Sequence, residues 1–97
     1  MSASSSAPAV FRCPAELTIF AADALRESLI ALAAGPVTVD ISDVRAVDGA
    51  GLQLLAAAAS TWRRRSLPWQ WQGESRTFDE EIALLGLAAV LGRSERS

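Results

Sequence analysis

Two stretches of the chain alternate apolar and polar side chains in the way a half-buried strand does, and a third, shorter stretch is mostly apolar. The clearest is 37–42, where Val, Val and Ile alternate with Thr, Asp and Ser directly after Gly35-Pro36. The residues at 67–72 alternate in the same way up to Gly73, and the shorter, mostly apolar run at 10–13 is limited by Pro14. The pattern therefore predicts a short first strand, a central strand and a late strand.

A helix is predicted between the second and third of these strands. Leu52, Leu55, Ala56 and Ala59 recur at the i, i+3, i+4, i+7 spacing of one helical stripe, and Asp48 is a suitable N-cap. The dipeptide Asp48-Gly49 is also typical of a type I′ hairpin turn. The residues that follow are strong helix formers without β-branching, and they favour the helix.

Two further helices have similar signals. The first is predicted from Ile19 or Phe20 to Ala33, with Thr18 as its cap and Leu25, Leu29 and Leu32 as its apolar stripe. The other is predicted over 76–85, because Phe78, Ile82 and Leu85 repeat at i, i+4, i+7 and Gly86 suits the position after the helix end.

Strands and helices that alternate over short connections form βαβ units, whose right-handed crossovers make the strands parallel. We therefore predict a small α/β fold with a mostly parallel sheet of about four strands. Because the strands alternate, helices should cover chiefly one face. The other face, with Thr38, Asp40 and Gln70, should be wetter or covered by another chain. The domain is expected over 10–91, between tails at 1–9 and 92–97.

Composition narrows the possible functions. A chain of 97 residues makes one domain, and its formal charge of −2 gives no general attraction to nucleic acid. There is no histidine and a single cysteine, Cys13, so the commonest metal ligand, the commonest general base and any internal disulfide are absent from the sequence. We expect no metal site and no cofactor. No segment resembles a signal peptide or a membrane span, which indicates a cytoplasmic protein.

The bend at Asp48 carries the clearest signal for function. A helix whose first turn is Gly49-Ala50-Gly51 is expected to present unpaired backbone N–H groups to a partner or a phosphate. Close packing of helix on strand is the alternative explanation of the glycines. A dinucleotide-binding fingerprint fits less well, because its third glycine would fall on Leu54. Asp48 is interpreted as a cap rather than a catalytic acid.

The basic run that ends the middle helix contains candidate anchor residues for a protein interface. Trp62 is predicted to be exposed beside Arg63 and Arg64, since Trp and Arg dominate interface hot spots. The arginines could equally form a solvated face that complements the negative helix end. Trp69 and Trp71 share one strand face and are predicted to belong to the core, as is Cys13.

The run VDISDVRAVDGAGLQLL, which follows a helix of the Ala-Asp-Ala-Leu-Arg-Glu type, resembles the STAS domain, named for sulfate transporters and anti-sigma factor antagonists. The resemblance covers about 10–91, and its most telling matches are Asp40, Ser42, Asp48, Gly51 and Leu52. It implies a non-enzymatic module that binds a regulatory protein through the loop and helix at 48–59. Direct contacts would then involve the run from Asp48 through Gly49, Ala50, Gly51 and Leu52 to Gln53, while Asp40 and Ser42 support the loop.

In many such domains a Ser or Thr directly after the Asp is phosphorylated to release the partner. Here Gly49 and Ala50 carry no hydroxyl, so the resemblance implies constitutive binding. The Gly-Ala-Gly run is similar to STAS proteins of chemotaxis-type signalling systems, with a kinase, receptor or response regulator as partner. The alternative is a cytoplasmic accessory subunit of a lipid-transporting ABC complex. A hydrolase that uses Ser42 with Asp40 would need a base that the sequence lacks.

Overall fold

The chain folds into two small groups of strands and a set of helices. The computed structural model describes residues 8–92. In chain order the elements are β1 (Ala9–Arg12), β2 (Glu16–Leu17), the 3-10 helix η2 (Ile19–Ala21), α1 (Ala22–Ile30), β3 (Val37–Asp40), β4 (Ala46–Val47), α2 (Gly49–Arg64), β5 (Trp69–Gln72), α3 (Arg76–Leu85) and α4 (Ala88–Leu91). Ala9, which was assigned to the N-terminal tail, opens β1 instead. Most of both predicted tails, 1–7 and 93–97, lies outside the described residues.

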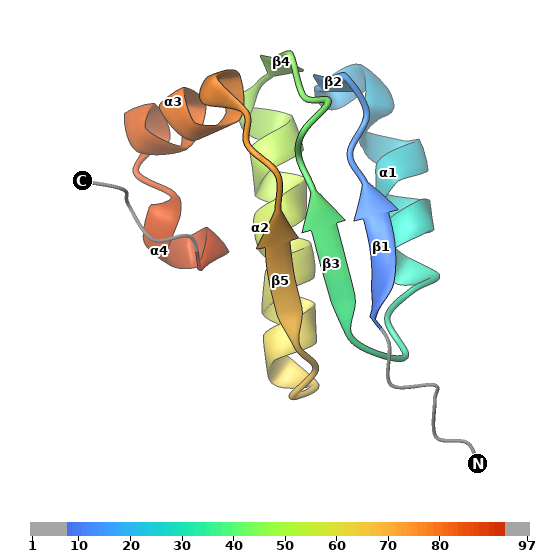
Figure 1. The fold of residues 1–97 in the computed structure, drawn as a ribbon. Helices are drawn as coiled ribbons and strands as arrows, with labels where there is room; N and C mark the ends of the chain where they lie inside the picture. The colour runs from blue at the N-terminus through green and yellow to red at the C-terminus, as the bar shows by residue number, and fades with distance from the viewer. Residues whose placement is uncertain (1–7, 93–97) are drawn as a thin grey trace.

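The main sheet has three parallel strands in the order β1-β3-β5 (Figure 1). Val37 of β3 lies between Ala9 and Trp69, and Asp40 lies between Arg12 and Gln72. The prediction of an α/β fold with parallel strands is confirmed. The strands β2 and β4 form a separate parallel pair above the carboxyl ends of the main strands. With two residues each, they are too short to show alternation in the sequence.

Helices cover one face of the sheet. Figure 1 shows α1 and α2 side by side behind the three strands, whose front carries no helix. The core lies between them and contains Phe11, Val37 and Val39 from the sheet with Leu29 and Leu55 from the helices. The uncovered face differs from the prediction, because Thr38 is only 9% exposed and Asp40 only 4%. Side chains of the flanking strands shield both from solvent, and only Gln70 is exposed as expected.

The first helix is shorter than predicted. A 3-10 turn occupies Ile19–Ala21, and regular α-helix runs only from Ala22 to Ile30. Thr18 precedes the turn, but its side chain makes no capping hydrogen bond. The N–H of Ile19 instead donates to Oδ2 of Asp48, 3.1 Å away. The cap predicted locally is thus supplied by a residue 29 positions later in the chain.

The third helix has the predicted bounds, and its ends explain why. Oγ of Ser75 accepts from the N–H of Phe78 at 3.1 Å and donates to the carbonyl of Val44 at 2.9 Å, which ties the helix start to the loop before β4. Gly86 ends the helix at φ 67°, a left-handed conformation that suits glycine. Of the three residues at i, i+4, i+7 spacing, Phe78 and Ile82 are buried and Leu85 is 46% exposed. The short helix α4 was not predicted.

Candidate functional site

The site is built around the corner where β4 passes into α2. Asp48 is the N-cap residue, with extended backbone, and its Oδ1 accepts from the N–H of Gly51 at 2.9 Å. Its Oδ2 accepts from Ile19, and its own N–H donates to the carbonyl of Leu17 at 3.2 Å. One carboxylate therefore caps α2 and also binds the start of the first helical segment. It holds the two helix starts together.

The corner offers fewer free donors than the sequence suggested. Backbone N–H groups of Gly51, Ile19 and Ala50 all lower the pKa of Asp48, with the contribution of Gly51 the largest. The carboxylate stays ionised at neutral pH and accepts from the N–H of Gly51, one of the donors that were expected to be open to a phosphate. The prediction of unpaired N–H groups at this helix end is therefore wrong for Gly51, whose N–H is bound within the chain.

Gly51 and Leu52 serve packing and do not face a partner. A Cβ at Gly51 would lie 2.1 Å from the carbonyl oxygen of Leu17, which leaves room for hydrogen only. Leu52 is fully buried in the core. Their expected role in direct partner contact is corrected for this reason: the first turn of α2 lies directly against the backbone at the end of β2. The packing explanation of the glycine run holds for Gly51.

Gly49 has a different environment. A Cβ placed there would meet only Cδ1 of Leu85, at 4.0 Å, which is ordinary van der Waals distance. Its backbone is not among the positive-φ glycines of the described residues, which are Gly73, Gly86 and Gly92. Gly49 and Ala50 are half-buried, and Gln53, one turn on, is exposed. This side of the corner is accessible from outside.

Large apolar side chains lie exposed on both sides of the accessible corner. On one side Phe20 is 94% exposed and its neighbour Ile19 is 61% exposed. On the other side Leu85, which is 46% exposed, lies beside Gly49, and the preceding residue on α3, Leu84, is 78% exposed. These residues carried no predicted role in binding: Leu85 was one of three apolar residues at helical spacing, and Ile19 and Phe20 marked only the start of a helix.

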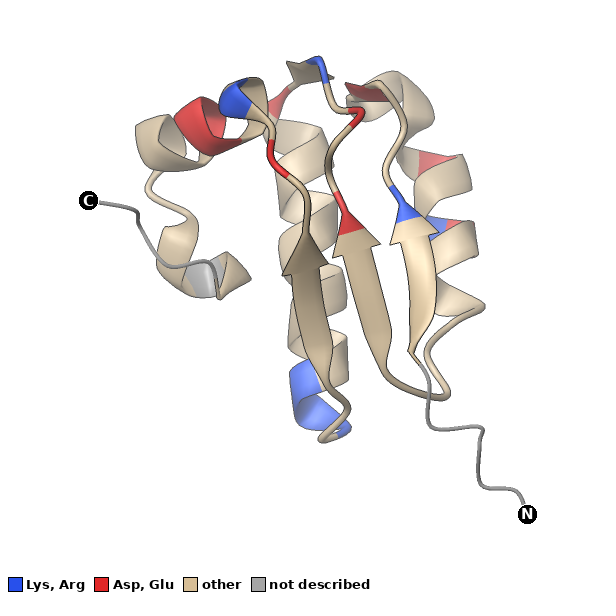
Figure 2. Cartoon of the chain, in the orientation of Figure 1, with Lys and Arg blue, Asp and Glu red and all other residues tan. Residues whose placement is uncertain are grey.

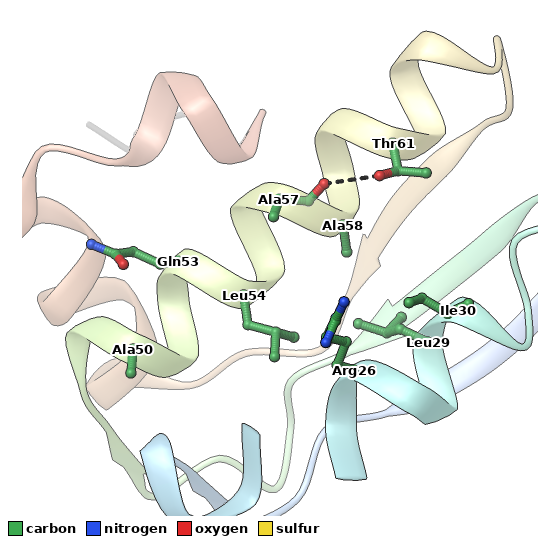
Figure 3. Close-up of a pocket in the computed structure, with 9 residues that line it drawn as sticks. All are labelled: Arg26, Leu29, Ile30, Ala50, Gln53, Leu54, Ala57, Ala58 and Thr61. Carbon is green, nitrogen blue, oxygen red and sulfur yellow. Dashed lines mark hydrogen bonds between the residues drawn. The ribbon is translucent and has the colours of Figure 1, made fainter. Parts of the chain in front are cut away.

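The outer surface of α2 is uncharged over its first thirteen residues, 49–61. Figure 2 shows basic residues only at the far end of this helix. Between α1 and α2 lies a groove of about 480 Å³. It is lined by Arg26, Leu29, Ile30, Ala50, Gln53, Leu54, Ala57, Ala58 and Thr61 (Figure 3).

Asp40 and Ser42 form a local polar network at the end of β3. Oδ1 of Asp40 accepts from the N–H of Ser42 at 2.9 Å and from its hydroxyl at 2.6 Å, while Oδ2 accepts from Nε2 of Gln72 at 3.2 Å. These bonds, led by that of the Ser42 hydroxyl, lower the pKa of Asp40. The Ser42 hydroxyl thus acts as a hydrogen-bond donor that holds a tight turn. Gly73 fits against it at φ 83°, because a Cβ there would lie 2.0 Å from the Ser42 oxygen.

The predicted interface anchor Trp62 is a core residue. It is 1% exposed, and its Nε1 donates to the carbonyl of Gly35 at 2.9 Å. Its ring packs edge to face with Trp69, at a centroid distance of 5.3 Å. The prediction of exposure was wrong because position 62 continues the buried stripe of Leu52, Leu55 and Ala59.

The two arginines that follow Trp62 are both exposed. The guanidinium of Arg64 donates to the hydroxyls of Ser60, at 3.2 Å, and Thr61, at 3.4 Å. It therefore lies back along its own helix. Both Arg63 and Arg64 are in the last turn of α2, more than three turns from the corner at Asp48, so the structure does not bring them together with the other candidate residues.

Cys13 is buried, as predicted. Burial, with a smaller contribution from the charge of Asp40, raises the pKa of its thiol to about 12, so the reactive thiolate is absent at neutral pH. Residues 8–92 contain no group of three or more His, Cys, Asp or Glu side chains arranged to hold a metal ion. Within the same residues no helix has the length and apolar character needed to cross a membrane.

Comparison with known proteins identifies the family. A family model described as "Mlab, STAS domain" matches residues 2–92, which is nearly the whole chain. No curated protein matches the chain. The chain therefore belongs to the STAS domain family, whose members are generally non-catalytic binding modules, and the observed α/β fold is consistent with that family.

Proposed function

We propose that this member of the STAS domain family is a non-enzymatic interaction module of bacterial signalling, similar to the anti-sigma factor antagonists. It binds a regulatory protein through the corner at Asp48 and the outer surface of α2 as far as Ala59. After the corrections above, the contact residues are Gly49, Ala50 and Gln53, with Asp48 holding the corner in place. Gly51 and Leu52 contribute by fixing the helix against Leu17.

One observation carries the proposal: the exposed apolar side chains lie around the accessible start of α2. Ile19, whose N–H is bound by Asp48, is 61% exposed, and Leu85, whose Cδ1 lies beside Gly49, is 46% exposed. Their sequence neighbours Phe20 and Leu84 are the two most exposed large hydrophobic residues of the described chain. Apolar residues exposed together beside an uncharged helix face are typical of a surface that another protein covers.

The two residues that follow Asp48 have no hydroxyl for a kinase to modify. Position 49 is Gly and position 50 is Ala, so the phosphate that would repel a partner through its added negative charge has no acceptor here. Binding at this corner is therefore constitutive in our proposal. A chemotaxis-type signalling system, with a kinase, receptor or response regulator as partner, is the setting we favour.

The same lack of a switch supports a second candidate. A subunit that stays attached permanently needs no phosphorylation site, and a cytoplasmic accessory subunit of a lipid-transporting ABC complex would use the same surface against the transporter ATPase. The two candidates differ in partner and not in fold. Identification of the bound protein separates them: a signalling protein supports the first and an ABC ATPase the second.

The experiment compares Gly49→Asp with Gly49→Ala as its matched control. Both variants add a Cβ that the structure accommodates, but only Asp places a second negative charge beside Asp48. After affinity capture from native extract, the dissociation constant of the captured partner is measured for each variant. Gly49→Asp should weaken binding at least tenfold, and Gly49→Ala should bind within about threefold of the unmodified chain. Equal affinity of the Asp variant and the unmodified chain would exclude the corner from the interface.

A further inference from the structure

The groove between α1 and α2 has one charged lining residue. Of the nine residues around it, six are apolar, two are uncharged polar residues, and the ninth is Arg26. Figure 3 shows Arg26 from α1 and Leu54 from α2 extending into the space between the helices from opposite sides. Among residues 8–92 Arg26 forms no ion pair or side-chain hydrogen bond. The groove thus combines an apolar floor with an unmatched cation.

The shape of the groove suits a helix. The lining positions on α2 run from Ala50 to Thr61, which is roughly 16 Å along the helix axis at 1.5 Å per residue. Three of these lining residues are alanines, so the backbone of another helix can approach closely. Ile30 on the opposite wall is 59% exposed and would be covered by such a helix. A third helix laid across two neighbours is a common way of burying apolar helix faces.

We propose that this groove receives an amphipathic helix of the partner protein, and that a Glu or Asp of that helix pairs with Arg26. The inference rests on the proposed function and names the chemistry of its partner. Apolar side chains at i, i+4 and i+7 of the incoming helix cover Leu54, Ile30 and the alanines between them. The carboxylate supplies the charge that Arg26 lacks, and the pair selects acidic over basic helices.

The test is a charge-swap selection that does not need the natural partner. A display library of helical peptides, built on one fixed scaffold with varied surface positions, is selected against the full chain and against Arg26→Glu. The control is Arg76→Glu, which makes the same charge change on α3, away from the groove. Arg26 and Arg76 are both exposed, and circular dichroism checks that each variant is folded.

The unmodified chain and Arg76→Glu should both enrich peptides with apolar residues at helical spacing and one acidic residue. Peptides selected against Arg26→Glu should instead carry Lys or Arg at the position of the acidic residue. This variant should bind the original peptides about fivefold more weakly. Peptide-induced amide shifts should centre on Ile30, Leu54 and Ala57. The proposal would be overturned if the same peptides were enriched against Arg26→Glu, or if the amide shifts lay outside the groove. Failure to recover any helical binder would also overturn it.

Two other occupants give different results. If the groove pairs two copies of this chain, sedimentation will show a dimer that Ala57→Arg abolishes. If it takes a small anionic amphiphile, decanoate will saturate the groove residues and no peptide will be enriched. Either result would overturn the proposal of a partner helix. Loss of the groove proposal leaves the Gly49 experiment unaffected, because that experiment uses the captured partner and a different residue.

Discussion

The two sides of α2 differ in burial and in the residues they carry. The inner side carries Leu52, Leu55 and Trp62, all within 1% of complete burial, and packs on the sheet. The outer side carries Gln53 and Ala57, which are exposed and uncharged. In a domain of this size the inner side must supply much of the core, so its residues are constrained by stability. The outer side has no such constraint, and its uncharged surface is the one that we propose for binding.

Gly49 and Gly51, two residues apart, also differ in how closely the rest of the chain surrounds them. A Cβ on Gly51 would collide with the backbone of Leu17, whereas a Cβ on Gly49 would only touch the side chain of Leu85. One glycine is required by packing and the other is not. A glycine run in a sequence is therefore no evidence for a binding loop until the surroundings of each glycine are known.

The largest effect on this comparison is expected from Trp62→Ala. The substitution removes a fully buried indole and leaves the carbonyl of Gly35 without its donor, so we expect a loss of about 3–5 kcal/mol in the free energy of unfolding. Denaturant unfolding measures the loss, and Trp62→Phe should recover part of it because the core volume is better preserved. A loss below 1 kcal/mol for the Ala variant would show that the inner side is not the stabilising one.

A smaller loss is expected from Gly51→Ala. The added methyl group must displace the backbone of Leu17 or the helix start, which should cost about 1–3 kcal/mol even after the helix propensity of Ala is gained. Thermal and denaturant unfolding both report it. An unchanged midpoint would mean that the corner yields easily and that its geometry is not fixed by packing.

Much of the fold could be predicted because the relevant signals are local. The strand at 37–40, the cap at Asp48 and the bounds of α3 all depend on spacing or on a residue adjacent to the element. The errors arose where distant residues decide. The strands β2 and β4 pair residues that are about thirty positions apart, and neither segment has a strand pattern of its own. The start of the first helix is capped by Asp48 rather than by Thr18.

The site was predicted less well than the fold. The motif identified the corner and Asp48, but it could not separate Gly49, which is accessible, from Gly51, which is packed. Exposure of Phe20 depends on a 3-10 turn that directs it away from the core, and no periodicity indicates this. Trp62 was misassigned from composition alone, although extending the stripe of Leu52, Leu55 and Ala59 by three residues would have placed it inside.

A gain rather than a loss is expected from Gly49→Ala. Its φ is not positive and the space beside it is open, so the substitution should add about 0.5–1 kcal/mol through reduced freedom of the unfolded chain and better helix propensity. Compared with Gly51→Ala in the same unfolding assay, the sign of the effect reverses over two residues. Destabilisation of both variants by similar amounts would remove the distinction between the two sides of the corner.

The smallest effect on stability is expected from Phe20→Ser, which should change the free energy of unfolding by less than about 0.5 kcal/mol. The ring is 94% exposed, so its removal takes almost nothing from the core. If Phe20 belongs to the proposed interface, the same substitution should weaken binding of the captured partner at least fivefold, as expected for an aromatic residue in an interface. Isothermal titration of the variant measures binding and denaturant unfolding measures stability. The control is Val10→Ser, an exposed position on β1 whose side chain alternates with that of the buried Phe11. Unchanged binding would mean that Phe20 lies outside the interface, and a loss of stability above 1 kcal/mol would mean that the ring packs within the chain after all.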